Sequence, residues 1–263
     1  MEMQRQEDGA VPGGTSLGGT RLGRAVRDGA DWPTAATQGS AAGAGTWQAA
    51  SLLDDSVAQA LVEANAGFIE RLAARVGTLG EGADERTQPA VFGLPLDGGR
   101  RVLRLLGPER HRLAGAHFAL FDLRFGDALF WSTALRSPPV VAESRVTGDT
   151  TRWVREAVVL AWHLAQRGDL AAALTLGMTP AVQSLWSTMR LGALDAAAVA
   201  AEGVLQARWA GHPRLWPQLL GAVERNDPAA LAAARHLGWQ LLATDGLRPA
   251  MVRRRGLRAD IRG

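Results

Sequence analysis

Apolar residues recur every three or four positions along much of the chain, which is the spacing of one face of an α-helix. The clearest stripe lies in residues 52–76 and contains Leu53, Val57, Leu61, Ala64, Phe68, Leu72 and Val76. Ser51, with Asp54 three residues later, matches the capping-box pattern at a helix start. Gly77 suits the position just after a helix end. The pattern therefore predicts a helix over about 52–76.

Residues 91–146 have a denser and less regular apolar pattern. Asp97 and Pro108 each suit the start of a short helix. The segment FALFDLRF at 118–125 alternates imperfectly, and it is too short to distinguish a strand from a turn of buried helix. Ser-Pro-Pro at 137–139 then predicts a link between two domains.

The third region, about 150–243, is predicted to be helical almost throughout. Two of its segments begin with a polar N-cap residue followed by proline at the first helical position, Thr179-Pro180 and Asp227-Pro228. The second of these predicts a helix that ends near Ala243. No internal repeat with a period of 20–50 residues is evident.

These patterns predict a mainly α protein in four parts. Residues 1–47 contain too little periodic apolar surface to offset the entropy of ordering, so they are predicted to form a disordered tail. A helical domain with an aromatic cluster follows at 48–146. A multi-helix domain occupies 147–247, and a basic tail occupies 248–263.

The net charge of +3 conceals an asymmetry. Residues 1–150 carry 15 arginines against 18 acids, whereas residues 151–263 carry 14 arginines against 8 acids. Six of those arginines lie in 248–263, where Asp260 is the one acid. The basic character is therefore concentrated at the C-terminal end of the chain.

The composition also bears on location. Cysteine is absent, which excludes disulfides and thiolate metal sites and suits a reducing compartment. The first residues are polar and acidic and lack the apolar segment of a secretory signal. No apolar run approaches the ~20 residues of a membrane span. We therefore expect a cytoplasmic protein without a membrane span.

Patterns typical of catalysis are missing from the sequence. The five histidines, at positions 111, 117, 163, 212 and 236, show no metal-ligand spacing. Lysine is absent, so the Walker phosphate-binding pattern is excluded. No Gly-x-Ser-x-Gly elbow occurs. We therefore expect no metal site, no cofactor and no enzymatic activity.

Aromatic residues suggest either a core or a surface for a partner. Five of them fall within residues 118–131, and a core is the more ordinary interpretation. Trp209 and Trp216 are further candidates, since tryptophan is enriched at protein interfaces. The candidate partner-docking residues are Phe121, Phe125, Phe130, Trp131, Trp209 and Trp216.

Residues 156–243 resemble the FlhD family of flagellar master regulators, which are small all-α transcriptional regulators. The resemblance rests on a long apolar helix (VVLAWHLAQRG), LTLGM, TPAVQSLWSTM, LGALDAAAVAAEG, VLQARWA, AAARHLGWQLLA and a basic RRRGLR end. It covers about a third of the chain, and residues 1–146 have no counterpart in that family. The resemblance implies an FlhD-like helical core that dimerises and acts in transcription with a partner subunit.

A DNA-binding role would draw on a helix-turn-helix-like segment at 170–203 and on the basic tail. The candidate DNA-binding residues are Gln183, Ser184, Arg190, Arg208, Arg253, Arg254, Arg255 and Arg258. The alternative for the arginines at 253–255 is an ordinary solvated tail. The favoured function is a non-enzymatic transcriptional regulator that acts as a homodimer or with a partner subunit. The alternative is a helical adaptor, or a secretion-chaperone-like interaction protein, that does not bind DNA.

Overall fold

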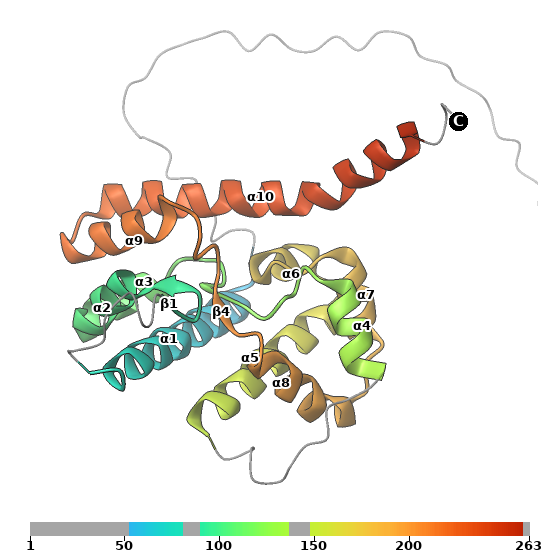
Figure 1. The fold of residues 1–263 in the computed structure, drawn as a ribbon, viewed down its shortest axis with the longest axis horizontal. Helices are drawn as coiled ribbons and strands as arrows, with labels where there is room; N and C mark the ends of the chain where they lie inside the picture. The colour runs from blue at the N-terminus through green and yellow to red at the C-terminus, as the bar shows by residue number, and fades with distance from the viewer. Residues whose placement is uncertain (1–52, 81–89, 137–147, 260–263) are drawn as a thin grey trace, which may run out of the picture. The chain divides into compact units, whose positions relative to one another are not determined.

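The computed structural model describes residues 53–80, 90–136 and 148–259, with the side chains of 170–172 and 246–259 excepted (Figure 1). The described residues form ten α-helices and four two-residue strands, which confirms the mainly α fold class. The predicted disordered tail at 1–47 and the predicted link at 137–139 lie outside the described residues.

The first group of elements is built around one long helix. It comprises α1 (Asp55–Gly77), β1 (Ala90–Val91), β2 (Leu94–Pro95), α2 (Leu96–Arg104) and α3 (Gly107–Ala114). Most of the predicted apolar stripe of α1 is buried, and Ala64 is half-buried. Asp54 is the N-cap of α1, because its carboxylate accepts the Ser56 N–H at 3.0 Å. The predicted capping box with Ser51 as the N-cap is therefore wrong, because Asp54, which was expected three residues inside the helix, is itself the N-cap.

A short strand and one helix then lead to the second long helix. These elements are β3 (Phe121–Asp122), α4 (Ala128–Arg136) and α5 (Asp149–Arg167). The ambiguous segment at 118–125 therefore contains a strand. β3 pairs antiparallel with a strand far along the chain, a contact that local sequence patterns do not reveal.

The remaining elements are α6 (Leu170–Leu176), α7 (Pro180–Ser187), the 3-10 turn η3 (Leu191–Ala193), α8 (Leu194–Glu202), β4 (Gln206–Ala207), α9 (Leu215–Glu224) and α10 (Pro228–Ala259). Both predicted cap-and-proline starts are confirmed: Thr179 caps α7 by accepting the Val182 N–H, and Asp227 accepts the N–H of Ala230 in α10. The predicted end of the last helix near Ala243 is wrong, since α10 continues through Ala259.

Both predicted helical domains contribute to one continuous apolar core. At its centre, the Phe121 ring lies 4.9 Å from the Trp153 ring and 6.1 Å from the Phe68 ring, measured between centroids. Trp153 comes from the second predicted domain, and its indole N–H donates to the Ala64 carbonyl in the first at 3.1 Å. The core thus crosses the position where the sequence suggested a boundary.

When β1, β2, α6 and η3 are left out, the chain contains the same series of elements twice. The order α1, α2, α3, β3, α4 corresponds to α5, α7, α8, β4, α9. In each series, a glycine lies before the last helix and a tryptophan lies five residues later, inside that helix. These residues are Gly126 and Trp131 in the first series and, 85 positions later, Gly211 and Trp216 in the second. The period is longer than the 20–50 residues over which repeats are usually sought.

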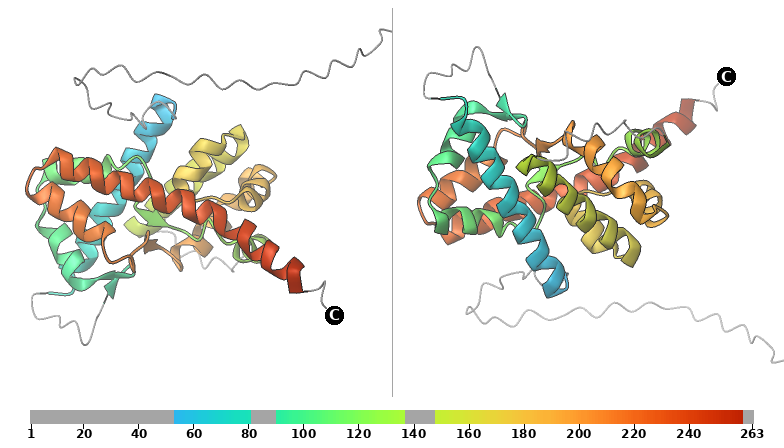
Figure 2. Two further views of the ribbon diagram at one scale, coloured as in Figure 1. Left: turned by 90° about the horizontal axis from the view of Figure 1, so that it is seen from above. Right: turned by 90° about the horizontal axis from the view of Figure 1, so that it is seen from below.

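The two series pack on one another reciprocally. α1 contacts α2 and α3, as α5 contacts α7 and α8. The last helix of each series crosses over: α4 packs on α7 and α8, and α9 packs on α2 and α3. Figures 1 and 2 show this exchange, with α9 beside α2 and α3 and α4 beside α7. Such reciprocal contacts are those of a two-fold arrangement with exchanged helices.

Contacts between equivalent elements agree with this two-fold relation. β3 pairs with β4, so that Phe121 faces Ala207 and Asp122 faces Gln206. The long helices are joined by two related ion pairs, Arg71 of α1 with Asp149 of α5 at 3.0 Å, and Arg167 of α5 with the α1 cap Asp54 at 3.3 Å. In each pair, an arginine near the end of one long helix meets an acid at the start of the other. One chain thus has the arrangement of a two-fold dimer.

Candidate functional site

The equivalent helices α4 and α9 differ in how much of their surface is covered. Seven of the ten residues of α9 are buried, whereas Trp131 is the one buried residue among the nine of α4. The difference arises from α10, which lies along α9 (Figures 1 and 2). No described helix occupies the equivalent place along α4.

Both helices are nevertheless held in place in the same way. At the start of α4, the Asp127 carboxylate accepts the Phe130 N–H at 2.9 Å. At the start of α9, the His212 imidazole Nδ1 accepts the N–H of Leu215 at 3.2 Å. These caps are 85 positions apart, like the two tryptophans. The open surface of α4 therefore belongs to a firmly anchored helix.

Trp131 and Trp216 fix the two helices to the segments that follow strands β3 and β4. The Trp131 indole N–H donates to the Arg124 carbonyl at 3.0 Å, and the Trp216 indole N–H donates to the Arg208 carbonyl at 2.8 Å. Both rings are buried. The backbone near each strand turns through a left-handed residue, Arg124 with φ 59° and Trp209 with φ 50°.

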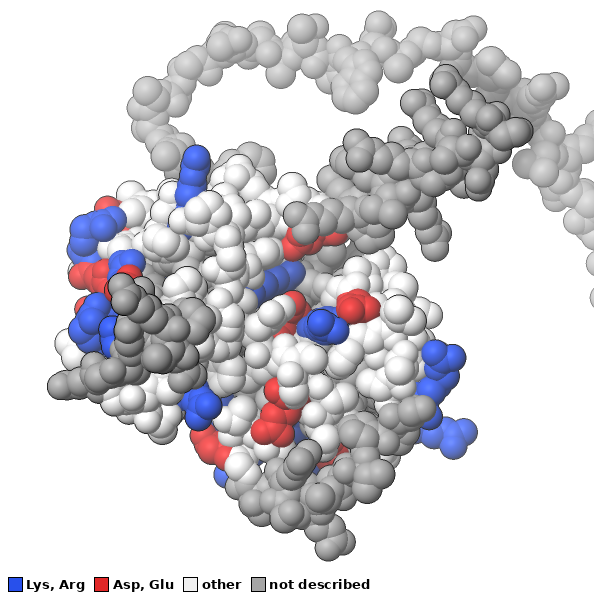
Figure 3. All heavy atoms as spheres, in the orientation of Figure 1, with Lys and Arg blue, Asp and Glu red and all other residues white. Residues whose placement is uncertain are grey.

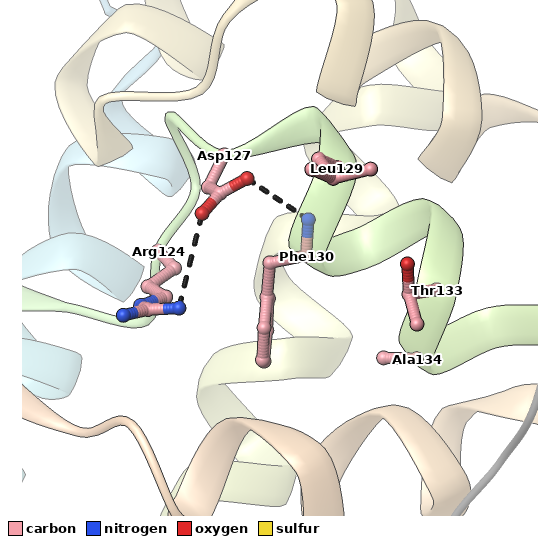
Figure 4. A pocket seen from close by; sticks show the side chains of 6 residues that line it. All are labelled: Arg124, Asp127, Leu129, Phe130, Thr133 and Ala134. Atoms are coloured by element: carbon pink, nitrogen blue, oxygen red, sulfur yellow. Dashed lines mark hydrogen bonds and ion pairs between the residues drawn. The ribbon is translucent and has the colours of Figure 1, made fainter.

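The open side of α4 carries a shallow hollow of about 350 Å³, here called the α4 hollow (Figure 4). Its lining residues are Arg124, Asp127, Leu129, Phe130, Thr133 and Ala134. Leu129 is 75% exposed, which is unusual for a large apolar side chain in an anchored helix. The Arg124 guanidinium lies 5.4 Å from the centre of the Phe130 ring and 3.8 Å from the Asp127 carboxylate. The hollow therefore combines apolar side chains with an ion pair between Arg124 and Asp127.

A second hollow, of about 480 Å³, lies between α4 and the segment formed by α7 and η3. Its lining residues are Ser132, Leu135, Arg136, Leu185, Thr188, Met189, Arg190 and Ala193. Arg136 and Arg190 are exposed, and nearby in η3 Leu191 is 67% exposed. Neither hollow brings together groups for acid–base or nucleophilic chemistry. Both suit the binding of a macromolecular surface.

The predicted DNA-binding residues do not form one surface. Ser184 and Arg190 are exposed at α7 and just after it, and Gln183 is half-buried. Apart from Arg208, the other candidates lie at the end of α10 and have a helical backbone: Arg253, Arg254, Arg255 and Arg258. The side chains of these four residues lie outside the described part of the chain.

Arg208 is buried, and the prediction that it contacts DNA is wrong. Its side chain donates to the Thr175 carbonyl at 2.9 Å, and its guanidinium stacks 4.3 Å from the centre of the Trp209 ring. Burial lowers the pKa of Arg208 to about 10, and the charges of Asp122 and Asp245 oppose that shift. Arg208 thus connects β4 to the end of α6 inside the fold.

Four of the predicted partner-docking residues belong to the core, so their assignment to a docking surface is corrected. Phe121, Phe125, Trp131 and Trp216 are 0–2% exposed. The Trp131 ring lies 4.7 Å from the Trp186 ring in an edge-to-face arrangement, and Phe125 packs on both. These rings stabilise the crossing of the two halves and are not available to a partner.

The other two predicted docking residues are half-buried. Trp209 donates its indole N–H to the Asp245 carboxylate of α10 at 2.7 Å, so an element of this chain already covers it. Phe130 lines the α4 hollow. Its neighbours Leu129 and Thr133 were not singled out from the sequence. The signal that would have found them is the 85-residue repeat, which makes α4 and α9 comparable.

Among the described residues, no three histidine, aspartate or glutamate side chains gather closely enough to hold a metal ion. No helix in those residues combines the length and apolar character of a membrane span. In comparisons with known proteins, no family model, no curated protein and no solved structure matches the chain.

Proposed function

We propose that this chain is a non-enzymatic transcriptional regulator that works with a partner subunit. The observation that carries the proposal is the reciprocal packing of the two halves, in which α4 and α9 are exchanged and β3 pairs with β4. The resemblance of residues 156–243 to FlhD-like regulators implies a dimerising helical core. In this chain, the two halves pack on one another as two subunits of a two-fold dimer would.

DNA contact in this proposal comes chiefly from the arginines at the end of α10. Binding to the DNA backbone needs several cations that can approach neighbouring phosphates. On the face shown in Figure 3, arginines occur in small groups, several of them beside acids, and no continuous basic surface extends across that face among the described residues. Arg253, Arg254, Arg255 and Arg258 are clustered in sequence on one helix. Ser184 and Arg190 would make secondary contacts.

The test is a fluorescence-anisotropy titration of the full chain against mixed duplex DNA at several salt concentrations. We expect salt-dependent binding that is weakened when the four α10 arginines are replaced by glutamine. Each lost phosphate contact lowers the slope of log affinity against log salt by roughly 0.9.

The matched control replaces four exposed arginines elsewhere, Arg75, Arg104, Arg152 and Arg214, with glutamine. It changes the net charge by the same amount, and we expect it to leave most of the binding. Equal weakening by both sets would mean that only net charge matters. Binding that neither set weakens would remove the α10 arginines from the mechanism.

A helical adaptor without DNA contact is the second candidate, and two observations favour it. Arg208, placed beside the helix-turn-helix-like segment in the sequence, is buried in the fold. The α4 hollow, in contrast, presents exposed apolar surface. A folded chain that does not bind duplex DNA at low salt, yet binds a partner protein at α4, would support the adaptor.

A further inference from the structure

The two exchanged helices meet the opposite half with different charges. Where α9 packs on α2, its last residue Glu224 accepts two hydrogen bonds from the Arg101 guanidinium, from Nε at 2.9 Å and from Nη2 at 2.7 Å. A bidentate pair of this kind is a strong and directional contact. The pairing lowers the pKa of Glu224 and raises the pKa of Arg101. The guanidinium at this crossing therefore has a carboxylate partner.

The crossing of α4 on α7 has two guanidiniums instead. Arg136 is the last residue of α4, and Arg190 follows the end of α7 by three residues. Both line the hollow of about 480 Å³ between α4 and the segment formed by α7 and η3, here called the α4–α7 hollow. Neither forms an ion pair within the described residues, and none of the described lining residues is acidic. Two like charges around one hollow favour an anionic occupant.

The arginines are the main donors that this hollow offers to a ligand. The Ser132 hydroxyl donates to the Leu129 carbonyl at 3.0 Å, and the Thr188 hydroxyl donates to the Leu185 carbonyl at 2.9 Å. Arg136 donates its Nε–H to the Ser132 carbonyl at 2.9 Å, and its two terminal nitrogens make no hydrogen bond within the described residues. A guanidinium with free terminal nitrogens matches the planar geometry of a carboxylate.

The rest of the α4–α7 hollow is apolar, and its α7 wall is anchored. The apolar lining residues are Leu135, Leu185, Met189 and Ala193. From α5, the Trp162 indole N–H donates to the Met189 carbonyl at 3.0 Å, and the Gln166 side-chain amide donates to the Ser187 carbonyl at 2.8 Å. These contacts hold the end of α7 before a ligand arrives, which lowers the entropy cost of binding. In η3, Leu191 adds an apolar side chain that is 67% exposed.

We propose that the α4–α7 hollow binds an acidic segment of a partner protein. An aliphatic side chain of that segment lies on the apolar lining, and carboxylates on either side of it pair with Arg136 and Arg190. The apolar lining favours a protein over a nucleic acid, whose backbone offers charge but little aliphatic surface. The inference rests on the part of the proposed function that calls for a partner subunit, and it does not depend on DNA binding.

The probe is a fluorescein-labelled peptide of sequence EELLEELLEE, titrated with the full chain and followed by fluorescence anisotropy. We expect saturable binding. Two further peptides separate the contributions, since EESSEESSEE keeps the carboxylates without leucine and QQLLQQLLQQ keeps the leucines without charge. Each should bind at least tenfold more weakly, because the hollow recognises both features.

Paired substitutions locate the contact. We expect Arg136→Gln combined with Arg190→Gln to weaken binding about tenfold or more, because two charge-assisted contacts are lost. The control Arg152→Gln combined with Arg214→Gln removes the same charge from exposed sites elsewhere and should leave binding unchanged.

A second pair of variants tests the hollow without removing an arginine. Thr188→Glu places a carboxylate among the lining residues and should weaken binding about tenfold, since it competes for the guanidiniums. Thr133→Glu, at an exposed residue of the α4 hollow, adds the same charge and should have little effect. Circular dichroism establishes that each variant is folded.

Four results would overturn the proposal. The first is the absence of saturable binding by EELLEELLEE, and the second is an equal loss from either substitution pair and its control. The third is a dimer that Thr188→Glu dissociates, which would make a second copy the occupant. The fourth is a loss of duplex DNA binding without a loss of peptide binding when Arg136 and Arg190 are replaced, which would make the hollow part of a nucleic-acid surface.

The two proposals of this protein's function fail separately. A chain that does not bind duplex DNA still gives the peptide readouts, because the probe contains no nucleic acid. A chain that does not bind the peptide still permits the comparison of the α10 arginines with their control set.

Discussion

The α4 and α9 helices show how two equivalent regions of one chain can acquire different roles. Both begin at a side-chain cap, both anchor a tryptophan to a backbone carbonyl, and both pack on the opposite half. Only α9 is covered by a further helix of the described chain. The difference teaches that the repeat determines the position of a helix, while the exposure of its outer side depends on the next segment of the chain.

The largest effect is expected from the two anchoring tryptophans. Trp131→Ala and Trp216→Ala should each lower the free energy of unfolding by about 3–5 kcal/mol, because each removes a buried ring and one hydrogen bond. Urea unfolding monitored by circular dichroism measures both. A loss below about 1 kcal/mol for Trp131→Ala alone would mean that α4 is a surface attachment and not the counterpart of α9.

A smaller loss is expected where the halves differ inside the core. Asn65 of α1 is buried and binds the Ala114 and Phe118 carbonyls and the Leu120 N–H, all at 2.8–2.9 Å. Val158 lies on the buried stripe of α5, the second long helix, and is apolar. Asn65→Val should cost about 2–3 kcal/mol, since three buried groups lose their partner.

The converse change tests the same asymmetry. Val158→Asn should also destabilise the protein, because it buries an amide where the structure provides no comparable set of loop groups among the described residues. Thermal unfolding of both variants is the measurement. If Val158→Asn were neutral, the core around α5 would satisfy a buried amide as the core around Asn65 of α1 does.

Two glycines at matching turns provide a finer comparison. Gly93 and Gly177 have φ of 76° and 77°, so alanine is strained at either place. Gly93→Ala should cost about 1 kcal/mol, since the nearest atom to the new Cβ is 3.6 Å away. Gly177→Ala should cost more, because the Cβ would collide with the guanidinium of Arg208. Equal losses in denaturant unfolding would mean that Arg208 moves aside freely.

The smallest effect concerns a histidine close to α10. Burial and the charge of Arg235 on α10 lower the pKa of His117 below its ordinary value of 6.5. As the pH falls below about 6.5, the unfolded chain takes up this proton before the folded chain does, so the stability contributed by neutral His117 is lost.

His117→Gln should therefore flatten the fall of the unfolding free energy between about pH 7 and 5. His163→Gln, at an exposed histidine of α5, is the matched control. If His163→Gln flattened the pH profile equally, the pH dependence would not come from the burial of His117 close to α10.

Much of the local structure could be predicted from the sequence because helices leave local signals. The apolar stripe of α1 and the starts at Thr179 and Asp227 depend on residues only a few positions apart. The candidate site was predicted less well. Arginine and tryptophan are residue types typical of binding surfaces, yet Arg208 and Trp216 both lie inside the fold. Their burial depends on contacts with Thr175 and with β4, which no local pattern contains.

The sequence by itself determined the mainly helical fold class, the starts of the principal helices and the absence of cysteine chemistry. These properties depend on residue type and short-range spacing. The tertiary structure alone decided that the halves exchange α4 and α9, and that α10 covers one of these helices and leaves the other open. The physical reason is that α4 packs on α7 and α8 and α9 packs on α2 and α3, segments far apart in the sequence. Periodicity along one segment does not encode which other segment it meets.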